Sequence, residues 1–145
     1  LLALTEVALT NEAYRAAKQR AAERGWKLIA GAARPPQRLR SATKAPGEHS
    51  ACRGGVTLLV RTPLRAEAVA CRTDERKELW ESGRWGEFVI RLRAAVTMRL
   101  HVVYGHSGAA QHEVPKRANE ALLRQIFEMA AIAPDLPTIV AGDFN

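Results

Sequence analysis

The last eight residues of the sequence combine an apolar run with polar side chains that could act on a water molecule. Residues 138–141 are rich in β-branched side chains and predict a buried strand. Gly142 interrupts the run, and Asp143 and Asn145 follow it. If the backbone stays extended past the glycine, Asp143 and Asn145 point to the same side, because side chains alternate along a strand. A carboxylate and a carboxamide placed side by side can orient a water and hold a charged oxygen.

Two earlier strands are also expected to end in polar chemistry. Glu6 follows the apolar residues 1–4 and shares a face with the strand's leucines. Tyr104 ends the strand expected at residues 98–104, and His106 lies just beyond it. A single acid, tyrosine or histidine is usually structural, but sites in layered α/β proteins gather where strand ends converge. We therefore expect one site formed by the following residues: Glu6, Tyr104, His106, Asp143 and Asn145.

Two helices are expected to position these strand ends. The first covers residues 11–24, where Thr10 or Asn11 can cap the start and Gly25 can end it. Its apolar stripe is thin and consists of small or aromatic side chains: Tyr14, Ala17 and Ala21. The second helix covers residues 116–131, after a turn at 105–108 and a polar loop to Pro115. Its core face has helical spacing and comprises Leu122, Leu123, Ile126, Phe127 and Ala130.

The remaining apolar segments predict strands at residues 26–30, 56–61, 64–71 and 88–92. Thr62-Pro63 separates two of them. Residues 73–86 are interpreted as a charged turn region whose tryptophans, Trp80 and Trp85, are partly buried against a sheet edge. A strand, a helix and then a run of neighbouring strands predict an α/β (α+β) fold with a largely antiparallel sheet.

The composition predicts one folded domain. The chain has 145 residues, of which 47% are hydrophobic, and it contains no low-complexity tract. It has no transmembrane run, and its first residues are too short an apolar core for a signal peptide. Cys52 and Cys71 form neither a metal pattern nor a disulfide framework, which favours free buried thiols inside the cell. Because the sequence starts at Leu1 and stops on the strand-end motif, we expect a fragment of a longer protein.

The positive charge is concentrated in the first two thirds of the chain. The net charge is +7, with 19 basic and 10 acidic residues over positions 1–100, against 3 and 5 over positions 101–145. A basic body beside an acid-bearing end suits a polyanionic substrate held over a cation, although a solvated basic surface gives the same count. The basic, proline-containing residues 34–53 either track phosphates or are disordered.

On these residues the chain resembles the endonuclease/exonuclease/phosphatase superfamily, which includes DNase I, the abasic-site endonucleases and the endonuclease domains of non-LTR retrotransposons. The matching segments run in family order over nearly the whole chain: residues 4–6, 54–60, 102–107, 117–127 and 139–145. The closing Gly142-Asp143-Phe144-Asn145 is the most specific of them. The resemblance implies a four-layer, DNase I-like sandwich of two sheets with helices outside, of which residues 1–145 are mainly one half of the two-sheet core.

The resemblance also implies a role for each strand-end residue. Glu6 is similar to the carboxylate that binds the catalytic Mg²⁺, for which Mn²⁺ can substitute. Asp143 resembles the residue that orients or deprotonates the attacking water, and Asn145 resembles the amide that positions Asp143 or a phosphate oxygen. Tyr104 matches a strand-end tyrosine that contacts the scissile phosphate, and His106 matches a His-Ser pair near the same turn. Phosphodiester hydrolysis needs an in-line water and a cation for the developing charge, so these residue types suit the reaction.

Two parts of the family pattern have no counterpart in the sequence. Family members begin one strand earlier, with an asparagine near the metal, and continue past the position of Asn145 into a second half that ends in an Asp-His pair. We therefore expect little or no nuclease activity from residues 1–145 alone. DNA is the expected partner in preference to RNA, with no membrane, and the retrotransposon branch further implies a reverse-transcriptase domain elsewhere in the protein and a nuclear location.

Two alternatives stay open at this point. The first lies within the superfamily and is an inositol-phosphate phosphatase or a sphingomyelinase-like phosphodiesterase, which shares the metal and water chemistry. The second is a non-catalytic remnant that keeps the first half of the fold and binds nucleic acid or nothing. Hydrolysis of duplex DNA compared with phosphoinositides separates the first from the leading interpretation, and salt-dependent DNA binding without cleavage favours the second.

Overall fold

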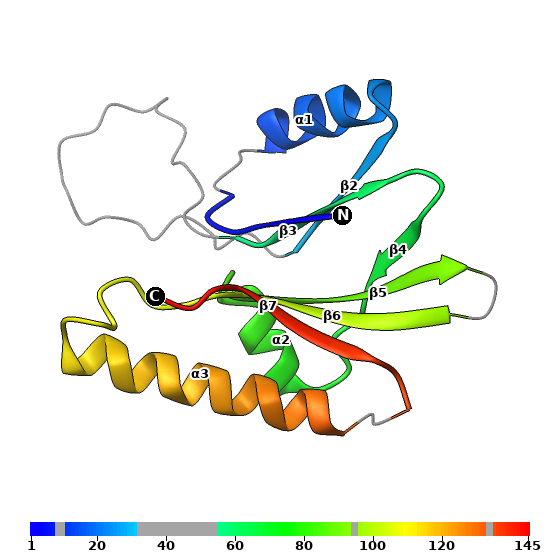
Figure 1. The fold of residues 1–145 in the computed structure, drawn as a ribbon. Coiled ribbons are helices and arrows are strands. Elements are labelled where there is room, and N and C mark those ends of the chain that lie inside the picture. Colours follow the sequence, from blue (N-terminus) through cyan, green and yellow to red (C-terminus); the bar gives the residue numbers. More distant parts are fainter. Residues whose placement is uncertain (8–10, 32–54, 94–95, 133–134) are drawn as a thin grey trace, which may run out of the picture.

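The protein is a mixed α/β structure with two sheets and three helices in the part of the chain described here. The computed structural model describes residues 1–7, 11–31, 55–93, 96–132 and 135–145. The two sheets lie face to face, with one helix outside the first sheet and two outside the second (Figure 1). Within these residues, no helix is both long and apolar enough to cross a lipid bilayer.

The first sheet is antiparallel and has three strands. Its order is β1 (Leu2–Leu4), β3 (Thr57–Arg61) and β2 (Trp26–Ala30), so the central strand comes from the middle of the chain. Helix α1 (Asn11–Glu23) connects β1 to β2 and packs on β2.

The second sheet has four strands in the order β4 (Arg65–Ala68), β5 (Trp85–Arg93), β6 (Val96–Tyr104) and β7 (Thr138–Asp143). The first three are antiparallel neighbours, whereas β6 and β7 are parallel. Helix α3 (Glu113–Ala131) makes the crossover between β6 and β7 and lies beneath the sheet with α2 (Asp74–Glu81) (Figure 1). The parallel pairing brings the C-terminal ends of β6 and β7 to the same end of the sheet, where Tyr104 is opposite Asp143.

Two apolar layers hold these elements together. The layer between the sheets consists of side chains from β3, β4, β5 and β6 and the residue before β3: Val56, Leu58, Val60, Ala66, Phe88, Ile90, Leu100, Val102 and Tyr104. The layer between the second sheet and its helices consists of Leu79, Trp85, Val103, Leu122, Ile126 and Met129. Strands β5 and β6 contribute side chains to both layers, because successive residues of a strand face opposite sides of the sheet.

Several predictions from the sequence are confirmed. The strand at 26–30 has the expected bounds, and α1 ends one residue earlier than expected, before Gly25 in its left-handed conformation (φ 74°). The expected stripe of α1 is also its inner face, because Tyr14, Ala17 and Ala21 are its partly buried residues among those with described side chains. The strand at 56–61 stops before Thr62-Pro63, and the sheets are largely antiparallel as predicted.

The turn region predicted at residues 73–86 is wrong. Residues 74–81 form helix α2, because the Thr73 side chain accepts a hydrogen bond from the Arg76 backbone and acids occupy the first turn. Strand β5 then begins at Trp85, whose side chain is only 1% exposed because it packs under the helices. The strand predicted at 64–71 is shorter, since β4 covers only Arg65–Ala68.

Two burial predictions are also corrected. The final strand is at the edge of its sheet, and Ile139 is 48% exposed because no strand of the described chain pairs with its outer side. In α3, which begins at Glu113 with Pro115 inside its first turn, Met129 is buried whereas Phe127 is 56% exposed. Cys71 is a free, partly buried thiol. Cys52 and the basic segment 34–53 lie outside the described residues.

Candidate functional site

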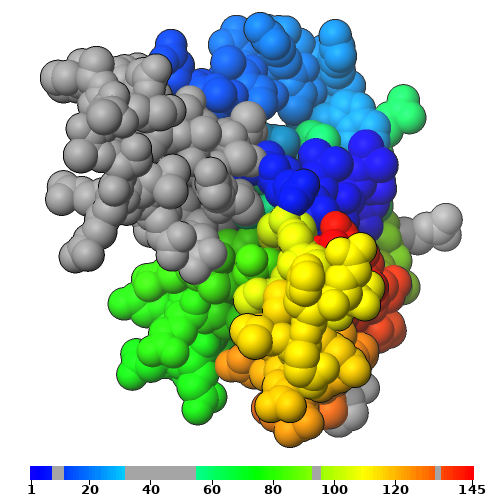
Figure 2. All heavy atoms as spheres, turned by 90° about the vertical axis from the view of Figure 1, so that its left-hand side faces the viewer, coloured from blue at the N-terminus to red at the C-terminus, as the bar shows by residue number. Residues whose placement is uncertain are grey.

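The hydroxyl of Tyr104 donates a hydrogen bond to Oε1 of Glu6. These residues are 98 positions apart in the sequence. Tyr104 ends β6 of the second sheet, and Glu6 follows β1 of the first sheet. Figure 2 shows the N-terminal residues against the red end of β7 and the yellow segment that follows β6. The first two of the three predicted strand ends are therefore joined by a direct bond.

A change of backbone direction brings Glu6 to this position. Leu2 and Leu4 are opposite Leu59 and Thr57 and lie on the outer face of their sheet, away from the layer that contains Tyr104. Strand β1 ends at Leu4, and Glu6 has a left-handed φ of 57°. The expectation that Glu6 shares a face with the leucines is thus wrong, because the strand does not continue as far as Glu6.

The third strand end lies beside the second. The backbone N–H of Gly105 donates to the carbonyl of Asp143 at 2.6 Å, which extends the pairing of β6 and β7 by one residue. The approach is close enough to require glycine: a Cβ on Gly142 would lie 1.9 Å from the Val103 carbonyl oxygen. The Asp143 side chain is therefore held at a fixed place on the sheet edge while remaining exposed.

Asn145 is attached to Asp143 through its backbone. Its N–H donates to Oδ1 of Asp143 at 3.1 Å, and its side-chain amide donates to the Gly105 carbonyl at 3.4 Å. The extended backbone ends at Asp143, because Asn145 has a left-handed φ of 47°. The two side chains therefore do not alternate along one strand as expected, yet the Asp143 carboxylate is oriented by a hydrogen bond from Asn145.

Asn119 connects these two chain segments from inside helix α3. Its side-chain amide donates to the Phe144 carbonyl at 2.5 Å, and its Oδ1 accepts the backbone N–H of His106 at 3.2 Å. Asn119 is only 8% exposed, so both bonds are made in a dry environment where a missing partner costs about 1 to 3 kcal/mol. Gly105 leaves the necessary space, since a Cβ there would lie 2.8 Å from Asn119 Oδ1.

His106 joins this cluster through its backbone N–H, and its partly exposed ring follows directly after the end of β6. The neighbouring Ser107 hydroxyl lies 3.3 Å from the Tyr104 hydroxyl. The structure thus brings all five predicted strand-end residues into one region of the surface. Glu6, Tyr104 and Ser107 form one connected group there, and Asp143, Asn145 and Asn119 form the adjoining one.

Arg84 supplies a positive charge behind the tyrosine. Its guanidinium donates to the carbonyls of Tyr104 (3.3 Å) and Gly105 (2.6 Å) and lies 5.1 Å from the centre of the Tyr104 ring. Burial and the hydrogen bond to Glu6 raise the pKa of Tyr104. The hydroxyl therefore keeps its proton at neutral pH and can act as a hydrogen-bond donor.

The residues present fit a magnesium ion in chemical type. Mg²⁺ is usually bound through one or two carboxylates together with waters and substrate phosphates, so a complete cage of protein ligands is not required. The Glu6 side chain is exposed, and within the described residues its Oε1 is the oxygen that accepts a hydrogen bond. Among the described residues, no group of three or more His, Cys, Asp or Glu side chains is placed to hold a metal ion together.

Sequence reasoning did not identify Asn119 or Arg84. Asn119 could have been found, because it lies three residues before Leu122 and seven before Ile126 on the buried face of α3. A lone amide on such an apolar stripe indicates a specific buried partner. Arg84 gives no comparable signal, since it is one of several charged residues near α2 and its role depends on where β6 ends.

No protein-family model matches the chain, and no match is found among curated proteins.

Proposed function

We propose that residues 1–145 form part of a Mg²⁺-dependent phosphodiesterase domain that cleaves DNA, of the endonuclease/exonuclease/phosphatase kind. The observation that carries this proposal is the Tyr104–Glu6 hydrogen bond, which joins an exposed carboxylate to a protonated phenol. A second carboxylate, Asp143, is opposite Tyr104 on the paired strand β7. The arrangement of two facing sheets with outer helices supports the DNase I-like sandwich expected from the resemblance.

Each residue has a role that its position permits. Glu6 would hold the metal ion, whose contribution when bound is to neutralise charge on the phosphate. The Tyr104 hydroxyl is a hydrogen-bond donor at neutral pH. It would donate to a phosphate oxygen in place of Glu6 once Glu6 binds the metal ion. Asp143, oriented by the N–H of Asn145, would accept a proton from the attacking water.

The metal site can be tested without an activity measurement. We expect Mn²⁺ to broaden the amide signals of residues 5–7, 104–107 and 143–145 in the NMR spectrum, and Mg²⁺ to compete with it. Replacing Glu6→Gln should abolish this broadening, whereas Glu12→Gln, an exposed glutamate on α1, should leave it unchanged. Equal broadening in both variants would show that the ion binds acidic residues without selection and would refute the metal site.

The resemblance leads to a separate expectation for catalysis. Residues 1–145 alone should show little or no Mg²⁺-dependent nicking of plasmid DNA, because the Asp-His pair implied by the resemblance is not among them. Strong nicking that disappears in Asp143→Ala would contradict this expectation. In a chain extended by a second half that carries such a pair, the same substitution should lower cleavage of duplex DNA by at least about a hundredfold, the usual size of a general-base contribution.

The basic character of the chain favours one alternative, a non-catalytic nucleic-acid-binding remnant. Its net charge of +7 is enough for salt-dependent association with DNA by itself. Two results together would favour this alternative over the phosphodiesterase. DNA binding would weaken steeply with salt, and Mn²⁺ would not broaden the amide signals of residues 5–7.

A further inference from the structure

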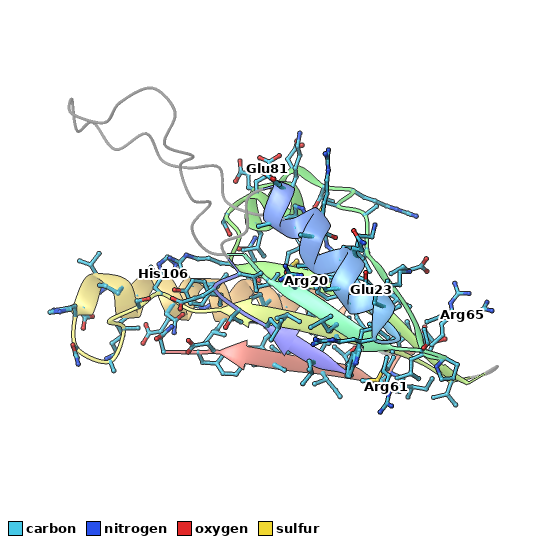
Figure 3. The ribbon with its side chains drawn as sticks, turned by 90° about the horizontal axis from the view of Figure 1, so that it is seen from above. Arg20, Glu23, Arg61, Arg65, Glu81 and His106 are labelled. Atoms are coloured by element: carbon cyan, nitrogen blue, oxygen red, sulfur yellow. The ribbon has the colours of Figure 1, made fainter. Side chains whose placement is uncertain are left out.

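A hollow of about 490 Å³ lies at the opposite end of the sheets from the candidate functional site. It is formed where β3 passes into β4 and where the start of β2 reaches across to the second sheet. Figure 3 shows Arg61 and Arg65 at this end of the molecule and His106 at the other. The hollow is thus separate from the strand ends that carry the proposed phosphodiesterase chemistry.

Specific hydrogen bonds fix the walls of this hollow. The backbone N–H and the hydroxyl of Thr62 both donate to the Gly25 carbonyl, each at 3.0 Å, which ties the β3–β4 turn to the turn before β2. Lys27 Nζ donates to the Ala66 carbonyl at 3.2 Å and so links β2 to the edge strand β4. A pocket whose two sides are joined in this way is preformed, as small-molecule sites usually are.

The lining combines an apolar floor with cationic side chains. Pro63, Leu64 and Val89 contribute apolar surface. The charged members are Lys27, Arg65, Arg91 and one acid, Glu67. Three cations against one carboxylate give the hollow a net charge of +2, so it favours an anionic ligand.

Most of the hydrogen-bond donors of these cations remain available. The Arg65 side chain makes no hydrogen bond or ion pair with any other described residue. Arg91 donates to Glu67 at 3.3 Å, but both side chains are about two thirds exposed, so this pair is weak and can exchange for a ligand. Lys27 uses one of its three N–H groups on Ala66.

We propose that this hollow binds a small organic phosphate, a phosphate monoester carried on an apolar or aromatic group. Two guanidinium groups and an ammonium match the several acceptor oxygens of a phosphate, which carries about −1.5 to −2 charge at pH 7. A phosphate alone would leave most of the hollow empty, whereas pockets of 300 to 1,000 Å³ are typical for organic ligands. The apolar floor then contacts the non-phosphate part.

The probe for this site is adenosine monophosphate, titrated into the ¹⁵N-labelled chain. We expect chemical-shift changes at the amides around residues 62–67 and 89–91 and none at residues 104–107. Adenosine without phosphate and inorganic phosphate alone should each bind at least about tenfold more weakly, because each provides only one half of the contacts. A duplex oligonucleotide that binds the same amides more tightly than the mononucleotide would overturn the assignment to a small ligand.

Paired variants separate this site from general charge attraction. Arg65→Gln should weaken binding by about tenfold or more, the loss expected for a charged hydrogen bond, whereas Arg124→Gln on α3 removes the same charge and should change it less than about twofold. Glu67→Gln should strengthen binding, and Glu120→Gln should not. Since all four side chains are exposed, folding should be unaffected. Equal effects within either pair would refute the site.

Discussion

His101 is a histidine that the fold keeps neutral. Its side chain is completely buried, and its Nδ1 accepts a hydrogen bond from the Trp85 indole N–H at 3.1 Å. The ring proton is therefore on Nε2, which has no hydrogen-bond partner in the described structure. Burial first, and then the charges of Arg99 and Arg76, lower the pKa of His101 from 6.5 to about 4.

This pKa makes stability depend on pH in a defined direction. Below pH 6.5 the unfolded chain binds a proton at His101 that the folded chain does not take up until about pH 4. Neutral His101 therefore contributes to the free energy of unfolding fully above pH 6.5, and this contribution is lost as the pH falls towards 4. The loss amounts to about 2 to 3 kcal/mol between pH 7.5 and pH 4.5. Urea unfolding at a series of pH values measures it.

The matched variants for that experiment are His101→Gln and His112→Gln. The first should remove the pH-dependent loss, because the titrating group is gone. The second removes an exposed histidine and should leave the slope as it is in the parent chain. A slope that persists in His101→Gln would assign the effect to other groups.

At the residue scale, the sequence predicted the members of the candidate site better than their contacts. Glu6, Tyr104 and Asp143 were recognisable because each follows an apolar strand, and the structure places them together. Their contacts depend on backbone turns at Glu6 and Asn145, where non-glycine residues have positive φ. Such conformations are set by the tertiary structure and not by local propensity, so no spacing pattern could predict them.

At the scale of whole elements, helix α2 is held on the second sheet by a buried ion-pair cluster. Glu87 of β5 is 1% exposed and lies 3.2 Å from both Arg76 of α2 and Arg99 of β6. The two arginines are also mostly buried, with 22% and 16% of their side chains exposed. A short helix of only eight residues is marginal by itself, so this cluster and Leu79 determine its position.

We expect Glu87→Gln to destabilise the fold by about 3 to 5 kcal/mol, because it leaves buried positive charge without a counter-ion. The control is Glu67→Gln, which breaks the exposed Glu67–Arg91 pair at 3.3 Å and should cost less than about 1 kcal/mol. Chemical denaturation at pH 7 compares the two variants. Similar small losses in both would mean that the buried cluster does not anchor α2.

The elements that the sequence predicted well are those with strong local signals. Strand β2 is a short apolar run, helix α1 ends just before Gly25, and α3 has a long apolar stripe. Helix α2 was missed because its charged residues 74–81 gave only one buried leucine, although Thr73 is a good N-cap. Burial of β7 was overestimated because an apolar run cannot reveal whether a strand has one neighbour or two.

At the scale of the whole molecule, the two sheets share one open side. Strands β1 and β7 are the edges of their sheets, they contact each other, and they lie along the same side of the sandwich (Figure 3). Within the described chain, neither has a strand paired to its outer edge. Apolar side chains are exposed there, including Leu2 at 51%, Leu4 at 36% and Ile139 at 48%. Adjacent open edges with apolar side chains are the usual template for association between chains.

We therefore expect residues 1–145 to self-associate through this side as concentration rises. Ile139 lies on the same face of β7 as Ala141, which packs in the layer between the sheets, so Ile139→Lys places an inward charge at the edge and should keep the chain monomeric. Val114→Lys, at a side chain 80% exposed on α3, is the control and should associate like the parent chain. Sedimentation velocity over a concentration series distinguishes them. If both variants associate equally, the contact lies elsewhere on the surface, and the edge of β1 and β7 is not the interface.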